Sequence, residues 1–294
     1  MSVPTSHAVR DRRDRCPGAL RPWPADDGLL VRLRLVGGRL PARGLRALLA
    51  LCERWGDGRI HLTSRANVQV RGLPSHGSGG PGGGGLAPEV LAAFEATGLL
   101  PSRSHELVRN IMVSPGTGIA GGRADLRGVA AALDAALLAR ARTAQLPGRF
   151  LFALDDGRGD LVDRPCDLGL VALNGTTAQL RIGEGLGPVT PLGDAVGALT
   201  GLALAFLRAR GEGPAAPWHV RELAVPLAAP VPPDPGLPPA TAPLPYGDVP
   251  AGRHVEIPGG TLTRALADEL LATGLDLVVT PWHGVLIPAA EVPR

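Results

Sequence analysis

The stretch "RHVEIPGGTLTRALADELLATGLDLVVTPWHGVLIP" (residues 253–288) contains the elements that decide the fold. Its first residues form a predicted strand that ends in Gly259-Gly260, and apolar residues then recur at helical spacing over about residues 262–273. Two short apolar segments follow, on either side of Thr280. The stretch therefore predicts a strand, a helix and a pair of strand segments, in that order.

The same order occurs near the start of the chain. There "LLVRLRLVGG" predicts a strand over residues 29–36, "PARGLRALLALCERW" predicts a helix over residues 41–55, and a second strand is predicted over residues 59–71. Aligning the two regions matches Gly37-Gly38 with Gly259-Gly260, Thr63 with Thr280, and Val68 with Val285. The sequence therefore predicts an internal duplication.

The first copy carries alternating polar residues that the second copy lacks. In "IHLTSRANVQVRG" (residues 60–72), polar residues occupy every second position: Arg65, Asn67, Gln69 and Arg71. Upstream, Arg32 and Arg34 alternate with apolar residues in the same way. Because successive side chains of a strand point to opposite faces, both strands present guanidinium groups from one face. The face is either an anion-binding surface or the ordinary solvated face of an antiparallel sheet.

Two linker-like stretches divide the chain. One is glycine-rich, "SHGSGGPGGGG" at residues 75–85, and the other is proline-rich, "VPLAAPVPPDPGLPPATAPLP" at residues 225–245. They separate a first unit over residues 1–74, a middle unit over residues 86–224 and a last unit over residues 246–294. The middle unit is predicted to hold helices at about residues 87–97, 123–144 and 191–210, and a strand meander with a hairpin at Asn174-Gly175. The fold class is α+β.

Composition limits the possible functions. The chain has 294 residues, of which 45% are hydrophobic and only 3% aromatic, and a formal net charge of +3. Nucleic-acid binding is not expected, because single-stranded bases need aromatic stacking platforms. No signal peptide and no membrane span are predicted, so a cytoplasmic location without membrane contact is expected.

The three cysteines do not form a metal-binding pattern. Cys16, Cys52 and Cys166 are widely separated, and no pair has the C-x-x-C spacing. A four-iron cluster is ordinarily held by four thiolates. We therefore expect no metal site in this chain.

Five motifs carry a resemblance to the siroheme-type nitrite and sulfite reductase superfamily, and most closely to its precorrin-3B synthases of aerobic cobalamin biosynthesis. They are "RCPGALRPWPADDGLLVRLRL" (15–35), "HLTSRANVQVRGL" (61–73), "RNIMVSPGTGI" (109–119), "LPGRFLFALDDGRGDL" (146–161) and "VVTPWHGVLIP" (278–288). The resemblance implies ferredoxin-like half-domains that occur twice around a mixed α/β domain contacting a tetrapyrrole. The tetrapyrrole would be a precorrin substrate or siroheme, a heme-type cofactor.

The resemblance also implies which residues bind the macrocycle. Arg32, Arg65 and Arg149 fall where family members hold the macrocycle or a small anion, and the planar guanidinium suits carboxylates. The alternation adds weaker candidates on the same faces: Arg34, Asn67, Gln69 and Arg71. The segment "VRNIMVSP" adds Arg109 and Asn110, although Asn110 could instead satisfy its own turn. No catalytic residue is assigned.

Two departures from the family bear on function. Family reductases carry a basic residue two positions beyond Arg149, where this chain has Leu151, which disfavours sulfite or nitrite as the substrate. In the family, the cysteines of a 4Fe-4S cluster lie in a half that follows the second copy, and this sequence ends at Arg294, before that half. The last unit is therefore expected to be incomplete, and a separate iron-sulfur half or electron donor is an expected partner.

Three functions remain open at this stage. The first is a component of an oxidoreductase of corrin synthesis, which holds its tetrapyrrole for oxygen-dependent ring hydroxylation. The second is part of an assimilatory nitrite or sulfite reductase. The third is a non-catalytic tetrapyrrole-binding protein.

Overall fold

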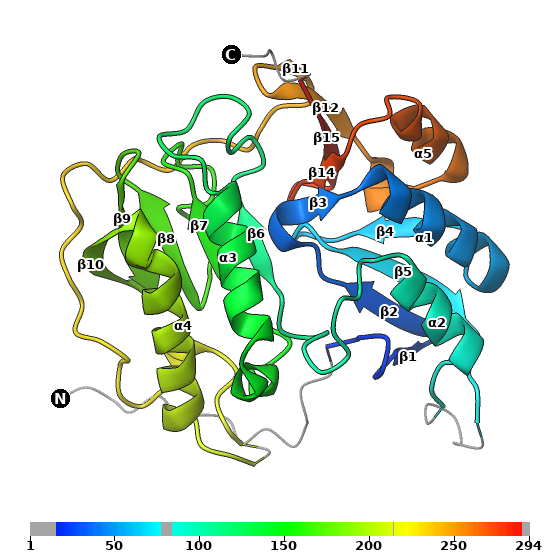
Figure 1. Ribbon diagram of the computed structural model, residues 1–294, viewed down its shortest axis with the longest axis horizontal. Helices are drawn as coiled ribbons and strands as arrows, with labels where there is room; N and C mark the ends of the chain where they lie inside the picture. The colour runs from blue at the N-terminus through cyan, green and yellow to red at the C-terminus, as the bar shows by residue number, and fades with distance from the viewer. Residues whose placement is uncertain (1–15, 78–83, 214, 290–294) are drawn as a thin grey trace.

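The computed structural model describes residues 16–77, 84–213 and 215–289, which form a duplicated body and a middle unit (Figure 1). The first copy of the body contains β1 (Trp23–Ala25), β2 (Gly28–Leu33), α1 (Ala42–Trp55), β4 (Ile60–Leu62) and β5 (Val68–Leu73). Its sheet has the order β1-β2-β5-β4-β13, and all its pairs are antiparallel.

The second copy repeats this topology. It contains β11 (Gly247–Val249), β12 (Gly252–Glu256), α5 (Arg264–Leu271), β14 (Leu277–Val279) and β15 (Gly284–Pro288). Its sheet has the order β11-β12-β15-β14-β3, which matches the first sheet strand for strand. Each copy lends one short strand to the other, because β3 (Arg39–Leu40) pairs with β14 and β13 (Thr261–Leu262) pairs with β4.

Backbone angles confirm the predicted alignment of the two copies. Each has a short 3-10 turn before its exchanged strand, η1 (Val36–Gly38) and η4 (Pro258–Gly260). The central glycines of these turns, Gly37 and Gly259, have φ angles of 60° and 59°. Among the residues that the structure describes, two non-glycine residues have positive φ, Ala66 and His283, with angles of 55° and 58°, and they also occupy matching positions. The duplication predicted from the sequence is therefore present in the structure.

The two copies share one hydrophobic core. Leu45, Leu48, Leu49 and Cys52 form the buried stripe of α1 and pack in a cluster that also contains residues of the second copy, such as Leu262 and Val279. Helix α2 (Pro88–Ala96) packs into the same cluster through Val90 and Phe94. The structure therefore groups α2 with the duplicated body, whereas the glycine-rich linker precedes it in the sequence.

The middle unit is a five-stranded mixed sheet with the order β10-β9-β8-β7-β6. Its strands are β6 (Ile111–Val113), β7 (Phe152–Asp155), β8 (Leu168–Ala172), β9 (Thr177–Ile182) and β10 (Gly185–Pro191). The predicted meander is only partly right, because β6, β7 and β8 are parallel and only β8, β9 and β10 are antiparallel. The expected hairpin at Asn174-Gly175 joins β8 to β9.

Two helices, α3 (Arg127–Leu138) and α4 (Leu192–Ala209), pack against one face of this sheet and lie in front of it in Figure 1. Short 3-10 turns occur at η2 (Ala141–Gln145) and η3 (Val220–Glu222). Within the described ranges, α4 is the one helix long and apolar enough to cross a membrane, but its buried face, including Leu199 and Phe206, belongs to the core of this unit.

The proline-rich linker lies against the middle unit as extended chain. The Val231 N–H donates to the Leu186 carbonyl, and the side chain of the buried Gln179 donates to the Pro232 carbonyl at 2.8 Å. Farther along, the Thr241 N–H donates to the Gly159 carbonyl. The linker is thus held on the middle unit by backbone and side-chain hydrogen bonds.

Candidate functional site

The segment that carries the predicted polar face is a hairpin, not one strand. Strands β4 and β5 are separated by a turn over residues 63–67, in which the Thr63 hydroxyl accepts from the N–H groups of Arg65 and Asn67 at 3.3 and 3.2 Å. The predicted continuous strand over residues 59–71 was wrong, because Ala66 adopts a positive φ and reverses the chain. Arg65 consequently lies at the tip of the hairpin, in the turn that precedes β5.

The alternation does hold along β2 and β5. Arg32 and Gln69 are directly opposite each other in these strands. With the Gln69 amide oxygen turned toward Arg32, it accepts from the guanidinium at 2.9 and 2.5 Å. Arg71 forms a bidentate ion pair with Asp27 at 2.9 and 3.1 Å, which holds the pKa of Asp27 below and that of Arg71 above their usual values.

Arg65 joins the hairpin of β4 and β5 to the middle unit. Its guanidinium donates to the backbone carbonyl of Arg149 at 2.8 Å. The exposed guanidinium of Arg149 lies 5.1 Å from the centre of the Trp218 ring, within reach of a cation–π contact. We refer to Arg32, Gln69 and Arg71, together with Arg65 and Arg149 at their end, as the arginine face.

Asn67 and Asn110 are buried and link the two units instead of lining a surface. The Asn67 oxygen accepts from the Leu35 N–H at 2.9 Å, and its amide nitrogen donates to Asn110 at 3.2 Å. Asn110 in turn donates to the Gly148 carbonyl at 2.9 Å, one residue before Arg149. Through these contacts, Asn67 supports the turn that contains Arg65, and Asn110 supports the chain next to Arg149.

Arg109 points away from the arginine face. Its guanidinium forms a partly buried bidentate pair with Asp134 of α3, at 2.6 and 2.8 Å. Arg34 is also buried and donates to the carbonyls of Pro17 and Arg32 at 2.8 and 3.0 Å. Of the residues predicted from sequence, Arg32, Gln69 and Arg71 thus lie together on β2 and β5, Arg65 and Arg149 meet at the hairpin tip, and the others are largely buried.

The second copy has no equivalent of the arginine face. In the alignment, His254 replaces Arg32 and Leu286 replaces Gln69. His254 is 1% exposed, hydrogen-bonds Thr280 at 2.9 Å and is covered by the Tyr246 ring at 4.7 Å. Burial lowers the pKa of His254, so the histidine is neutral at physiological pH. Only the first copy therefore offers permanent positive charge at this place.

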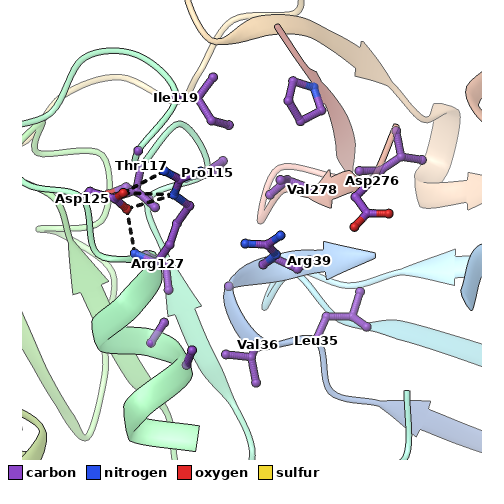
Figure 2. Close-up of a pocket in the computed structure, with 18 of the residues that line it drawn as sticks. Leu35, Val36, Arg39, Pro115, Thr117, Ile119, Asp125, Arg127, Asp276 and Val278 are labelled. Atoms are coloured by element: carbon purple, nitrogen blue, oxygen red, sulfur yellow. Dashed lines mark hydrogen bonds and ion pairs between the residues drawn. The ribbon is translucent and has the colours of Figure 1, made fainter. Parts of the chain in front are cut away.

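Sequence reasoning missed a trough of about 1370 Å³ between the duplicated body and the middle unit (Figure 2). It exceeds the roughly 300–1,000 Å³ of ordinary small-molecule sites. One wall contains Arg39 and Val278, and the other is the loop between β6 and α3, where Asp125 forms a bidentate pair with Arg127 at the start of α3. The glycine-rich "SPGTGIAGG" (114–122) directly after a strand was the available signal.

Most charged groups that line the trough already hold partners. Of the predicted residues, it is lined by Arg34 and Arg109, both of which already hold internal partners. Its carboxylates are engaged as well, since Asp134 pairs with Arg109 and Asp276 accepts from the Ala42 N–H at 3.1 Å. The trough can hold a large ligand of mixed polarity, and its lining is net positive, with five arginines against three aspartates.

The chemistry of the cysteines does not fit an iron-sulfur cluster. Among residues 16–77, 84–213 and 215–289, no group of three or more His, Cys, Asp or Glu side chains could hold a metal ion. Burial raises the pKa of Cys52 to about 12 and that of Cys166 to about 11, so both remain protonated thiols.

Leu151, the residue two positions beyond Arg149, is buried in a small cluster with Met112 and Leu161.

Comparison with known proteins identifies a domain class in the first copy. Residues 24–76 match the nitrite/sulfite reductase ferredoxin-like half domain. The chain therefore carries a half domain of this class, and its resemblance to oxidoreductases of the nitrite and sulfite reductase type is supported at that level.

Individual relatives extend the match. The chain is 44% identical to a precorrin-3B synthase of Sinorhizobium over 62 residues, which are 21% of this chain and 14% of the relative. It is 33% identical to a ferredoxin–nitrite reductase of Synechococcus elongatus over 140 residues, covering 45% of this chain and 26% of that protein. The alignments thus span only part of the relatives' length.

One solved structure shows the same fold. The NirA protein of Mycobacterium tuberculosis superposes with a TM-score of 0.65 at 18% identity, over 92% of this chain and 57% of that one. The α+β fold with duplicated ferredoxin-like half-domains is therefore confirmed.

Proposed function

We propose that the chain binds a polycarboxylate tetrapyrrole on the arginine face, as the tetrapyrrole-holding part of an oxidoreductase of corrin synthesis that resembles precorrin-3B synthase. The observation that carries this proposal is the asymmetry of the two copies. The first copy carries Arg32 on β2 and Arg65 at its hairpin tip, beside Arg149 of the middle unit, while a buried neutral histidine stands at the position of Arg32 in the second copy.

The face is suited to hold carboxylates in a fixed geometry. Arg32 is aligned by Gln69, and Arg65 by the carbonyl of Arg149, so their guanidinium groups are ordered before a ligand binds. Such preorganisation lowers the entropy lost on binding and fixes the orientation of the ring. A bound siroheme would supply redox chemistry, whereas a bound precorrin would be the substrate.

The corrin branch is favoured by two observations. The precorrin-3B synthase relative has the higher identity, although over a short segment. Leu151 is 5% exposed and packs in a hydrophobic cluster, so it adds no charge for sulfite or nitrite at the position where reductases are basic. The reaction proposed for the complete system is oxygen-dependent hydroxylation of the ring, with electrons delivered through a cluster outside the described residues.

A nitrite or sulfite reductase part is the second candidate. Two relatives named ferredoxin–nitrite reductase match 45% and 37% of this chain, more than the precorrin-3B synthase does. A protein that binds a tetrapyrrole without catalysis is the third, and the lack of a fitting cluster site among the described residues favours it.

The second copy offers a docking surface for a cluster-carrying unit. In the first copy, Val36 of η1 packs against the core of the middle unit. The matching residues of η4, Pro258 and Gly259, are exposed, and so is His283 at the tip of the neighbouring hairpin. By the symmetry of the two copies, a second unit like the middle one would dock there.

The test compares ligands and partners. Titration with precorrin-3A, siroheme and uroporphyrin III, followed by absorbance, is expected to give one site per chain, with precorrin-3A binding in preference to siroheme. Co-expression with a cluster-binding unit is expected to give precorrin-3A turnover that the chain alone lacks. Preference for siroheme with nitrite turnover would favour the reductase, and binding without turnover in any combination would favour the third candidate.

A further inference from the structure

One side chain of the middle unit contacts both hairpin turns of the duplicated body. Arg164 donates from Nη1 to the Ser64 carbonyl and from Nη2 to the Pro281 carbonyl, each at 3.1 Å. Ser64 follows Thr63, and Pro281 follows Thr280, which the duplication places at equivalent positions. A single guanidinium therefore spans the two equivalent turns.

The loop that carries Arg164 is held rigidly. Arg181 of β9 donates to the carbonyls of Leu161 and Arg164 at 2.9 and 2.7 Å. At the start of the loop, the Asp155 carboxylate accepts from three backbone N–H groups, those of Gly157, Gly159 and Leu161. The backbone at Arg164 is thus anchored to the sheet of the middle unit, and the guanidinium is the part that both turns share.

The first turn is the one that presents Arg65. Its backbone is held by Arg164 through Ser64, the residue directly before Arg65, and the Arg65 side chain is held by the Arg149 carbonyl at 2.8 Å. The second turn contains Trp282 and His283, which border the exposed docking surface. A displacement of either turn would therefore shift the guanidinium of Arg164 and alter its hydrogen bond to the other turn.

We infer that Arg164 is a positioning residue that couples the two turns, so that contact of a partner with the second turn and ligand binding by Arg65 are energetically linked. The assignment of a ligand to Arg65 rests on the proposed function, whereas the coupling of the turns rests only on the two hydrogen bonds. The linkage is reciprocal, because a partner that strengthens ligand binding is itself bound more tightly when ligand is present.

Hydrogen exchange of the ligand-free chain tests the coupling. Arg164→Ala is expected to speed amide exchange in residues 63–67 and 280–284 by about tenfold, with β8 and β9 unchanged. Arg123→Ala is the matched control, because Arg123 also donates to two backbone carbonyls, those of Leu173 and Gly236, in segments away from both turns. Unchanged exchange at either turn in Arg164→Ala would overturn the inference.

A second variant separates coupling from local support. Trp282→Ala perturbs the second turn and is expected to speed exchange at residues 63–67 in the wild-type background. In the Arg164→Ala background it should have no further effect there. An equal effect of Trp282→Ala on residues 63–67 in both backgrounds, or no effect in either, would show that Arg164 does not carry the coupling.

Ligand affinity provides the link to function, with uroporphyrin III as the probe. Arg164→Ala is expected to weaken binding about tenfold, and to do so only when Arg65 is present, so that the double variant binds no more weakly than Arg65→Ala. Additive losses would mean that Arg164 does not act through Arg65. If the wild-type chain binds no tetrapyrrole, the proposed function fails, and the exchange experiments still decide whether the turns are coupled.

Discussion

Replacing Asn67 by Ala is expected to destabilise the fold and not to act directly on the ligand. Asn67 is 1% exposed, and its loss would leave two buried groups without their hydrogen bonds, the Leu35 N–H and the Asn110 amide oxygen. An unsatisfied buried polar group costs about 1–3 kcal/mol, so we expect the free energy of unfolding to fall by about 2–6 kcal/mol.

Urea unfolding followed by circular dichroism measures this loss. The matched control is Asn174→Ala, because the exposed Asn174 also accepts from backbone N–H groups, of Thr176 and Thr177, but in a solvated hairpin. The control is expected to cost about 1 kcal/mol or less. Equal and small losses in the free energy of unfolding of the two variants would refute the interior role of Asn67. Weaker tetrapyrrole binding by Asn67→Ala without a loss of stability would refute it more strongly.

Two further predictions concern stability. Burial raises the pKa of Asp160 from its usual 3.8 to about 7, so its ionisation destabilises the folded state as the pH rises from about 4 to 7. Asp160→Asn should therefore gain at least about 1 kcal/mol relative to wild type between pH 4 and pH 8 in urea unfolding, and parallel pH profiles would contradict this. Gly38→Ala should cost about 2 kcal/mol or more, because φ is 70° and a Cβ would lie 2.1 Å from the Val279 carbonyl oxygen. Gly260→Ala, whose nearest backbone neighbour would be 3.3 Å away, should cost less, so equal melting temperatures of the two variants would be the contrary result.

Much of the fold could be predicted because it is written in local patterns. The double glycines at residues 37–38 and 259–260 signal backbone angles that other residues rarely adopt, and the structure confirms them. The apolar stripe of α1 was equally clear, since Leu45, Leu48 and Cys52 fall on one helical face.

Other features depend on contacts between distant residues. The exchange of β3 and β13 between the sheets involves two-residue strands, which are too short to carry a periodic pattern. The hairpin turn at residues 63–67 was missed because its tip contains neither glycine nor proline, and the alternation of polar residues continues across it.

The candidate site was predicted in part, because local strand alternation is visible in the sequence and contacts between distant residues are not. Strand alternation identified Arg32, Gln69 and Arg71 as neighbours on one face. It could not show that Asn67 and Asn110 are buried partners, because their contact joins residues 43 positions apart in different units. Nor could it place Arg164 between two turns that lie 100 and 117 positions away in sequence.

The most direct test of the arginine face is the affinity of Arg65→Ala for uroporphyrin III, measured by absorbance titration beside Arg46→Ala. Arg46 is exposed on α1, outside the face, so its replacement removes an equal charge. Arg65→Ala is expected to weaken binding by about 1–3 kcal/mol, with a nearly unchanged melting temperature, whereas Arg46→Ala should bind as wild type does. Equal affinities of the two variants would show that the first copy presents an ordinary solvated face.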